Sequence, residues 1–126
     1  MADEVKQEAG TEQTAPMSED LEMTIFSIIS AVGTARSMYI EAIHLAKDGK
    51  FDEAEQMVKD AQDVFVEGHH AHAALIQRAA AGESIDASML LMHAEDQLMS
   101  AEGFGILADE FISVYKKMAG VEEPAA

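Results

Sequence analysis

Apolar residues recur at helical spacing in three long segments of this chain. The first segment follows Ser18, a residue type that commonly caps a helix, and carries Glu19 and Asp20 in its first turn, where acidic side chains favour a helix. Its apolar positions are Ile25, Ile28, Ile29, Val32, Ala35, Tyr39, Ile43 and Ala46. Gly49 is placed to end this helix, because glycine readily adopts the left-handed conformation of a C-terminal cap.

The second segment has a start signal of a different kind. Asp52 and Glu55 stand three residues apart, which is the spacing of a capping box at the start of a helix. The positions on its core stripe are Ala54, Met57, Val58, Ala61, Val64, Phe65, Gly68, Ala71, His72, Leu75 and Ile76. We expect this helix to run to about Ala81, with Gly82 closing it.

The third segment should begin near Ser88 and stop at Gly120. Its apolar positions include Leu91, Leu98, Leu107, Phe111, Val114 and Met118. Three helices of about 30 residues, each about 45 Å long and joined by short loops, favour an antiparallel up-down-up three-helix bundle. Such a bundle has room for a core but no deep pocket. Residues 18–118 form the predicted domain.

The two ends of the chain differ from this domain. Residues 1–17 are polar, contain few bulky apolar side chains and include Pro16, so we expect a disordered N-terminal tail. Residues 119–126 are short, acidic and contain Pro124, which predicts a flexible C-terminal tail. We find no internal repeat, no Gly-rich phosphate loop and no alternating strand pattern.

The composition supports an all-α fold and excludes some functions. Hydrophobic residues make up 48% of the 126 residues, Trp is absent, aromatics are 6%, and nine Met favour helix over sheet. Without cysteine, the chain can form neither a disulfide nor a phosphocysteine. The 8 basic and 24 acidic residues give a net charge of −16, which repels nucleic acid and anionic lipid.

The sequence also bears on localisation. The start of the chain lacks the basic and apolar regions of a signal peptide. We find no apolar run that approaches the roughly 18 residues of a membrane span. We therefore expect a cytoplasmic, soluble protein without direct membrane insertion.

The main candidate for chemistry is a polar stripe on the third predicted helix. His93, Asp96, Gln97 and Ser100 are three and four residues apart, so they share one helix face. The stripe interrupts an apolar seam made of Met89, Phe104, Leu107, Phe111, Val114 and Met118. Polar groups in such a seam must be hydrogen-bonded, paired or functional. From the pattern alone, His93 is either an interfacial histidine beside a register-setting Asp96 or a nucleophile whose neutral nitrogen attacks phosphorus.

The other histidines are His44, His69, His70 and His72. Glu41 with His44, and Glu67 with His70, have the Glu-x-x-His spacing used in di-iron bundles. Both pairs fall off the core stripes on the helical wheel, so we expect them to face away from the interior and disfavour a di-metal site. His72 falls on the core stripe and could reach the third helix.

Three further groups have mainly structural interpretations. The acidic residues Asp52, Glu53, Glu55, Asp60 and Asp63 are most simply a solvated helix face. The methionines Met57, Met89, Met92 and Met99 suit gap-filling core positions better than a ligand surface. Arg36 is an isolated cation on the first helix; a surface ion pair is its simplest role, and a phosphate-binding role stays open.

The segment from His93 to Met99 resembles the active-site segment of the lactose/cellobiose/chitobiose IIA family of the sugar phosphotransferase system, whose pattern reads H-A-Q-D-H-L-M. Other segments match the same family in order and spacing: Gly33–Ser37, Ala46–Phe51 with Ala54, and Gly68–His69 leading to Leu75–Gln77. The resemblance covers about residues 21–118.

This resemblance implies a three-helix protomer that assembles into a homotrimer. It implies a phosphohistidine at His93, which takes its phosphoryl group from the carrier protein HPr and passes it to a cysteine of a IIB component during uptake of a β-linked disaccharide. Asp96 is similar to the family residue that meets its symmetry mates around one structural divalent ion per trimer, which we expect to be Mg²⁺. The alternative is a non-catalytic trimeric helical scaffold.

The chain departs from the family pattern at four positions. The family's Gln is Glu95 here, and its second histidine is Gln97, so a role that requires an imidazole there is not transferred. His72 and Ala73 stand where the family usually has Gln-Thr. The sequence does not indicate whether lactose, cellobiose or chitobiose is transported, because the sugar meets the membrane component and not this chain.

Overall fold

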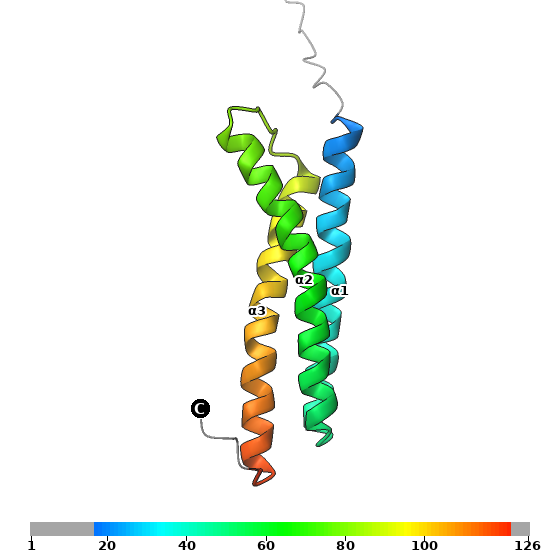
Figure 1. Ribbon diagram of the computed structural model, residues 1–126, viewed down its shortest axis with the longest axis vertical. Coiled ribbons are helices and arrows are strands. Elements are labelled where there is room, and N and C mark those ends of the chain that lie inside the picture. The colour runs from blue at the N-terminus through cyan, green and yellow to red at the C-terminus, as the bar shows by residue number, and fades with distance from the viewer. Residues whose placement is uncertain (1–16, 122–126) are drawn as a thin grey trace, which may run out of the picture.

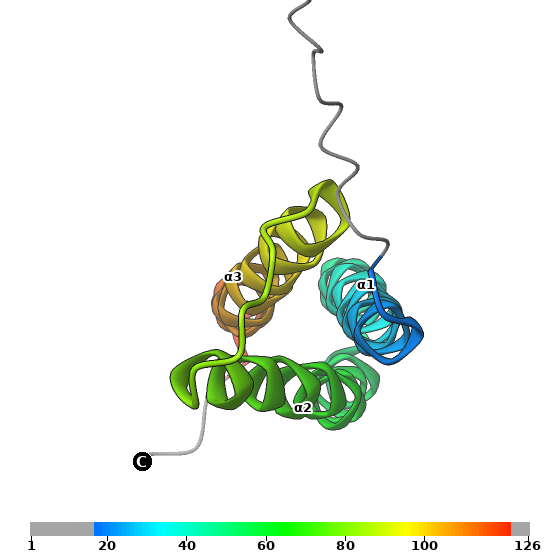
Figure 2. The same cartoon turned by 90° about the horizontal axis from the view of Figure 1, so that it is seen from above.

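The computed structural model describes residues 17–121, which form a bundle of three antiparallel helices (Figure 1). These are α1 (Glu19–Lys47), α2 (Phe51–Ala80) and α3 (Met89–Met118). Seen from above, they occupy the corners of a triangle (Figure 2). The predicted all-α class and three-helix architecture are confirmed. Most of the two predicted tails, residues 1–16 and 122–126, lies outside the described residues.

Local signals set most helix ends as the sequence predicts. Ser18 Oγ accepts a hydrogen bond from the Leu21 amide at 3.2 Å, and Ser88 Oγ accepts one from the Leu91 amide at 3.1 Å. The three predicted stop signals are the glycines with positive φ: Gly49 at 80°, Gly82 at 93° and Gly120 at 72°. Each adopts the left-handed conformation that ends a helix at low steric cost.

The predicted capping box at the start of α2 is wrong. The N-cap residue is Lys50, which makes no side-chain capping hydrogen bond, and Asp52 already lies inside the first turn. The turn after α1 is too tight for a helix that starts after Asp52. The Lys50 amide donates to the Leu45 carbonyl at 2.9 Å, and α2 begins at the next residue. Glu55 instead pairs with Lys116 of α3.

The core lies along α1, which packs against both other helices, whereas α2 and α3 contact each other least. Ile25, Ile28 and Val32 are the largest fully buried side chains. Toward the α1–α2 turn the core is made mostly of alanines around Tyr39. The small side chains let the helices approach closely there.

The apolar face predicted for α3 is only partly the core face. The buried positions of α3 are Ala94, Leu98, Ala101, Gly105, Ala108 and Ile112. Leu98 was predicted, but Leu107, Phe111, Val114 and Met118 lie about a quarter-turn or more away on the helix and are exposed. Small residues line the buried side because α3 packs closely on α1, so the large apolar side chains remain outside.

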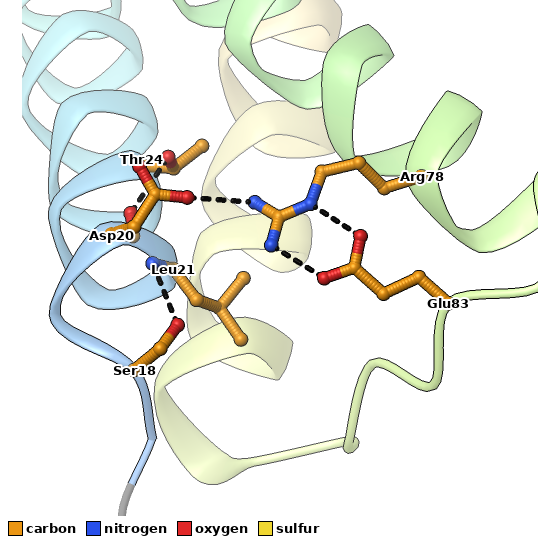
Figure 3. A network of polar contacts seen from close by, with 6 residues as sticks. All are labelled: Ser18, Asp20, Leu21, Thr24, Arg78 and Glu83. Carbon is orange, nitrogen blue, oxygen red and sulfur yellow. Dashed lines mark hydrogen bonds and ion pairs between the residues drawn. The ribbon is translucent and has the colours of Figure 1, made fainter.

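A polar network joins the end of α2, the α2–α3 loop and the start of α1 (Figure 3). Arg78 at the end of α2 donates two hydrogen bonds to Glu83 of the loop, at 2.8 and 2.7 Å. It also donates to Asp20 in the first turn of α1, at 3.3 Å. The hydrogen bonds from Arg78 lower the pKa of Glu83. One guanidinium therefore ties together the loop, α1 and α2.

α1 is long and apolar enough, by length and composition alone, to cross a membrane, which the search for apolar runs in the sequence did not anticipate. The core helix of a soluble protein meets the same criterion. The position of α1 explains its apolarity, because α1 supplies the side chains that fill the space between α2 and α3.

Candidate functional site

His93 lies in the second turn of α3, one residue before the buried Ala94. Its own side chain is exposed. The serine cap at Ser88 fixes where α3 begins, and the burial of Ala94 and Leu98 against α1 fixes which way the helix is turned. These two local effects present His93 at the surface on a rigid element.

The predicted polar stripe is present as one patch around His93. Asp96 is exposed like His93, whereas Gln97 and Ser100 are half-buried at the edge of the α1 contact. The patch therefore extends from the exposed surface of α3 toward the bundle interior. It offers one imidazole, one carboxylate, one amide and one hydroxyl on adjacent turns.

Arg36 of α1 is the cation of this site. Its Nη1 donates a hydrogen bond to Gln97 Oε1 at 3.3 Å, and its Cζ lies 5.1 Å from the centroid of the Phe104 ring. Its Nε is buried and has no hydrogen-bond partner among the described residues. The surface ion pair predicted for Arg36 is wrong, because the helix places this side chain against an amide and an aromatic ring of α3.

His72 reaches α3 as its position on the core stripe predicted. Its Nε2 lies 2.6 Å from Glu95 Oε1, and since an ionised carboxylate only accepts, the imidazole donates this hydrogen bond. His72 and Glu95 are two of the positions at which the chain departs from the family pattern, and the fold brings them together. The contact ties α2 to the second turn of α3, two residues along the chain from His93.

The other histidines lie away from this patch. His69 is exposed and stacks on Phe65, with ring centroids 6.2 Å apart. Glu41, His44, Glu67 and His70 are all exposed, so both Glu-x-x-His pairs face outward as predicted. Within residues 17–121, no group of three or more His, Asp or Glu side chains could hold a metal ion.

The apolar seam beside the polar patch is exposed in the single chain. Met89, Leu107, Phe111, Val114 and Met118 are between 41% and 81% exposed. A second exposed stripe, Met92, Met99 and Ile106, follows α3 on the other side of Asp96. The interpretation of Met89, Met92 and Met99 as core residues is wrong for the single chain. Asp96 thus stands between two apolar stripes. The sequence analysis missed the second stripe, although the seven-residue spacing of Met92, Met99 and Ile106 indicates a shared helix face.

The described surface also has an open hollow near the α1–α2 turn, lined by Glu41, Leu45, Glu53, Gln56, Met57 and Asp60. It lies toward the opposite end of the bundle from His93. On the same end, burial raises the pKa of Asp109, with further contributions from the charges of Glu110 and Glu55. These groups are remote from the polar patch and add nothing to its chemistry.

Three comparisons place the chain among known proteins. The family model described as "PTS system, Lactose/Cellobiose specific IIA subunit" matches residues 23–116. The lichenan-specific phosphotransferase enzyme IIA component of Bacillus subtilis is 39% identical over 102 residues, covering 81% of this chain and 93% of the relative. The lactose-specific EIIA component of Staphylococcus epidermidis is 35% identical over 99 residues, covering 79% of this chain and 95% of the relative.

The fold agrees with a solved member of this group. The crystal structure of the cellobiose-specific enzyme IIA from Bacillus anthracis matches with a TM-score of 0.80 and 41% sequence identity. The match covers 82% of this chain and 95% of that chain. Sequence and structure therefore point to the same family.

Proposed function

Since this chain belongs to the lactose/cellobiose-specific IIA family of the sugar phosphotransferase system, we propose that its phosphoryl group is carried on His93. As a IIA component, it takes part in phosphoryl transfer between a donor and an acceptor protein. The donor is HPr and the acceptor is a cysteine of a IIB component. The observation that carries the assignment to His93 is its exposure on a rigid helix within a polar patch, where two different protein active sites can reach it.

The transfer needs a nucleophile and a way to stabilise negative charge, but no ATP or further cofactor. The lone pair of a neutral His93 nitrogen forms the new N–P bond while the N–P bond of phosphorylated HPr breaks, and that electron pair returns to the donor histidine. In the second transfer, the thiolate of the IIB cysteine forms an S–P bond as the N–P bond to His93 breaks, and that electron pair returns to the His93 nitrogen. Backbone and side-chain donors stabilise the charge on the three phosphoryl oxygens during each step.

Assembly as a homotrimer is part of this proposal. Asp96 stands between two exposed apolar stripes of α3, and a helix at a three-fold axis contacts one neighbour on each side. Such an arrangement would cover both stripes and bring three copies of Asp96 together. Three like charges would repel unless a cation neutralised them, and a hard ion such as Mg²⁺ suits oxygen ligands. The ion would be structural and would take no part in phosphoryl transfer.

We further infer a cytoplasmic location, because the donor, the acceptor domain and a chain of net charge −16 all suit an aqueous compartment. The transported sugar is a β-linked disaccharide. The relatives carry names that refer to lichenan and lactose, and the choice of sugar belongs to the membrane component that the sugar meets.

The test is phosphorylation by phosphorylated HPr, followed by mass spectrometry. The protein should gain one acid-labile phosphoryl group per chain, and His93→Ala should abolish the gain while leaving the helix content intact, since it removes the nucleophile but no core side chain. His70→Ala is the matched control, because His70 is also an exposed helical histidine. Labelling that survives in His93→Ala would reject the assignment.

The second candidate is a trimeric helical scaffold without phosphoryl transfer. It is favoured by the same exposed stripes of α3, which suit assembly whether or not His93 reacts. In that case wild-type protein would assemble as proposed and gain no phosphoryl group from phosphorylated HPr.

A further inference from the structure

Gln97 lies one helical turn from His93 on the same face of α3. Residues four apart on a helix are neighbours, and helical side chains lean toward the N-terminus, so Gln97 extends toward His93. Gln97 is half-buried and His93 is exposed. Gln97 therefore lies closer to the bundle interior than His93 does.

Arg36 determines which arm of this amide faces the bundle. A guanidinium group has only donors, so the 3.3 Å contact of Arg36 Nη1 requires the oxygen arm of Gln97. Arg36 is itself held over the ring of Phe104. The Nε2 arm of Gln97 is consequently turned away from Arg36, and no described residue accepts a hydrogen bond from it.

We propose that Gln97 donates a hydrogen bond from Nε2 to the phosphoryl group on His93, and that Arg36 is the positioning residue that orients it. The inference rests on the proposed function, in which His93 is the acceptor. A hydrogen bond to a charged acceptor is stronger than one to a neutral acceptor, so this donor favours the phosphorylated state over the free imidazole. The positive charge of Arg36 behind the amide acts in the same direction.

The other members of the patch are less suited to this role. Asp96 carries a carboxylate, which accepts hydrogen bonds and repels phosphoryl oxygens. Ser100 lies seven residues, or about two turns, from His93. Gln97 is therefore the donor side chain of α3 that is both near His93 and already oriented.

The transfer step defines what Gln97 stabilises. As the N–P bond to His93 forms and the N–P bond of the HPr histidine breaks, negative charge remains on the three non-bridging phosphoryl oxygens. Gln97 Nε2 donates to one of these oxygens and keeps its proton. The amide thus contributes no atom or electron pair to the new bond.

Gln97→Glu is the sharpest test, because glutamate has the same shape, keeps an oxygen for Arg36 and replaces Nε2 with an acceptor. We expect phosphoryl acceptance from phosphorylated HPr to be slower by roughly 10- to 100-fold, as for loss of a hydrogen bond to a charged group. Gln97→His keeps a ring N–H and should stay within a few-fold of wild type. Gln62→Glu, at an exposed position on α2, is the control for added charge and should match wild type.

A second measurement separates donation from a structural role. In ¹⁵N-labelled wild type, the side-chain amide resonances of Gln97 should move on phosphorylation of His93, and Arg36→Lys should weaken that response. Circular dichroism of each variant verifies helix content. The inference would be overturned if phosphorylation of His93 in wild type left the Gln97 resonances unchanged and Gln97→Glu reacted within about twofold of wild type. The proposed function would survive that result. Labelling that survives in His93→Ala would instead overturn the proposed function on which it rests.

Discussion

Two glycines occupy positions at which the helices of the bundle approach one another closely. A Cβ added at Gly68 of α2 would lie 2.7 Å from Cγ1 of Val32, and one added at Gly105 of α3 would lie 2.9 Å from Cζ of Tyr39. Both neighbours are buried, so they have little room to move. Glycine is needed at these positions for space and not for backbone conformation.

We predict that Gly105→Ala lowers the free energy of unfolding by about 1–3 kcal/mol, because a methyl group must be forced against a buried ring. Gly103→Ala on the same helix has no atom within 4 Å of the added Cβ. It should be neutral or stabilise by up to about 1 kcal/mol, since alanine is the better helix former. Urea denaturation of both variants measures the difference, and equal effects would contradict the close contact.

At the scale of the element, helix ends and inter-helix polar contacts hold α1, α2 and α3 in register. Arg78 links the end of α2 to the loop and to α1, whereas His72 and Glu95 link α2 to α3 near His93. These contacts lie at the end of the bundle that carries the polar patch. The alanine-rich end near the α1–α2 turn depends mainly on close packing.

The Arg78–Glu83 contact predicts a pH dependence of stability. The pKa of Glu83 is lowered in the folded state, so its contribution is fully present above the unfolded pKa and is lost as the pH falls through the lower, folded value. Glu83→Gln should therefore be less stable than wild type at neutral pH, and the difference should vanish in acid. Urea denaturation at pH 7 and on the acid side of the folded pKa checks this.

Glu102→Gln is the control for this experiment, because Glu102 is exposed and makes no ion pair among residues 17–121. Its difference from wild type should be small at both pH values. A Glu83→Gln difference that persists unchanged in acid would show that the charge of Glu83 is not the cause.

At the scale of the whole molecule, the exposed stripes of α3 bear on assembly. We predict a trimer, and we predict that Leu107→Glu dissociates it, because three carboxylates would be placed in a seam from which water is excluded. Val66→Glu introduces the same charge at an exposed apolar position of α2 and should leave the trimer intact. Sedimentation velocity distinguishes trimer from monomer. A wild-type monomer at micromolar concentration would contradict the prediction that the seam of α3 forms a trimer contact.

The proposed ion makes a separate prediction about Asp96. Trimer stability should fall on chelation, and also on acidification through the carboxylate range, because both remove the ion from three converging carboxylates. Asp96→Leu should stay trimeric without metal, since it replaces the charges with apolar contacts. Light scattering with and without chelator tests this, and a trimer indifferent to chelator would reject the ion but not the seam.

The sequence by itself determined the elements and the helix face that carries the proposed site. Periodicity, the serines at positions 18 and 88 and three glycines placed the helices to within a residue or two, because these signals act within one turn of backbone. The stripe that contains His93 and Asp96 also follows from spacing alone, since residues three and four apart share a helix face in any fold.

Only the tertiary structure decided which faces meet. The core side of α3 is lined by small residues such as Ala101 and Gly105, because close packing on α1 selects side chains by size and not by hydrophobicity. The contacts of Arg36 with Gln97 and of His72 with Glu95 join residues on different helices, and no local pattern specifies the relative rotation of two helices. That rotation follows from how the side chains of all three helices fill the space between them.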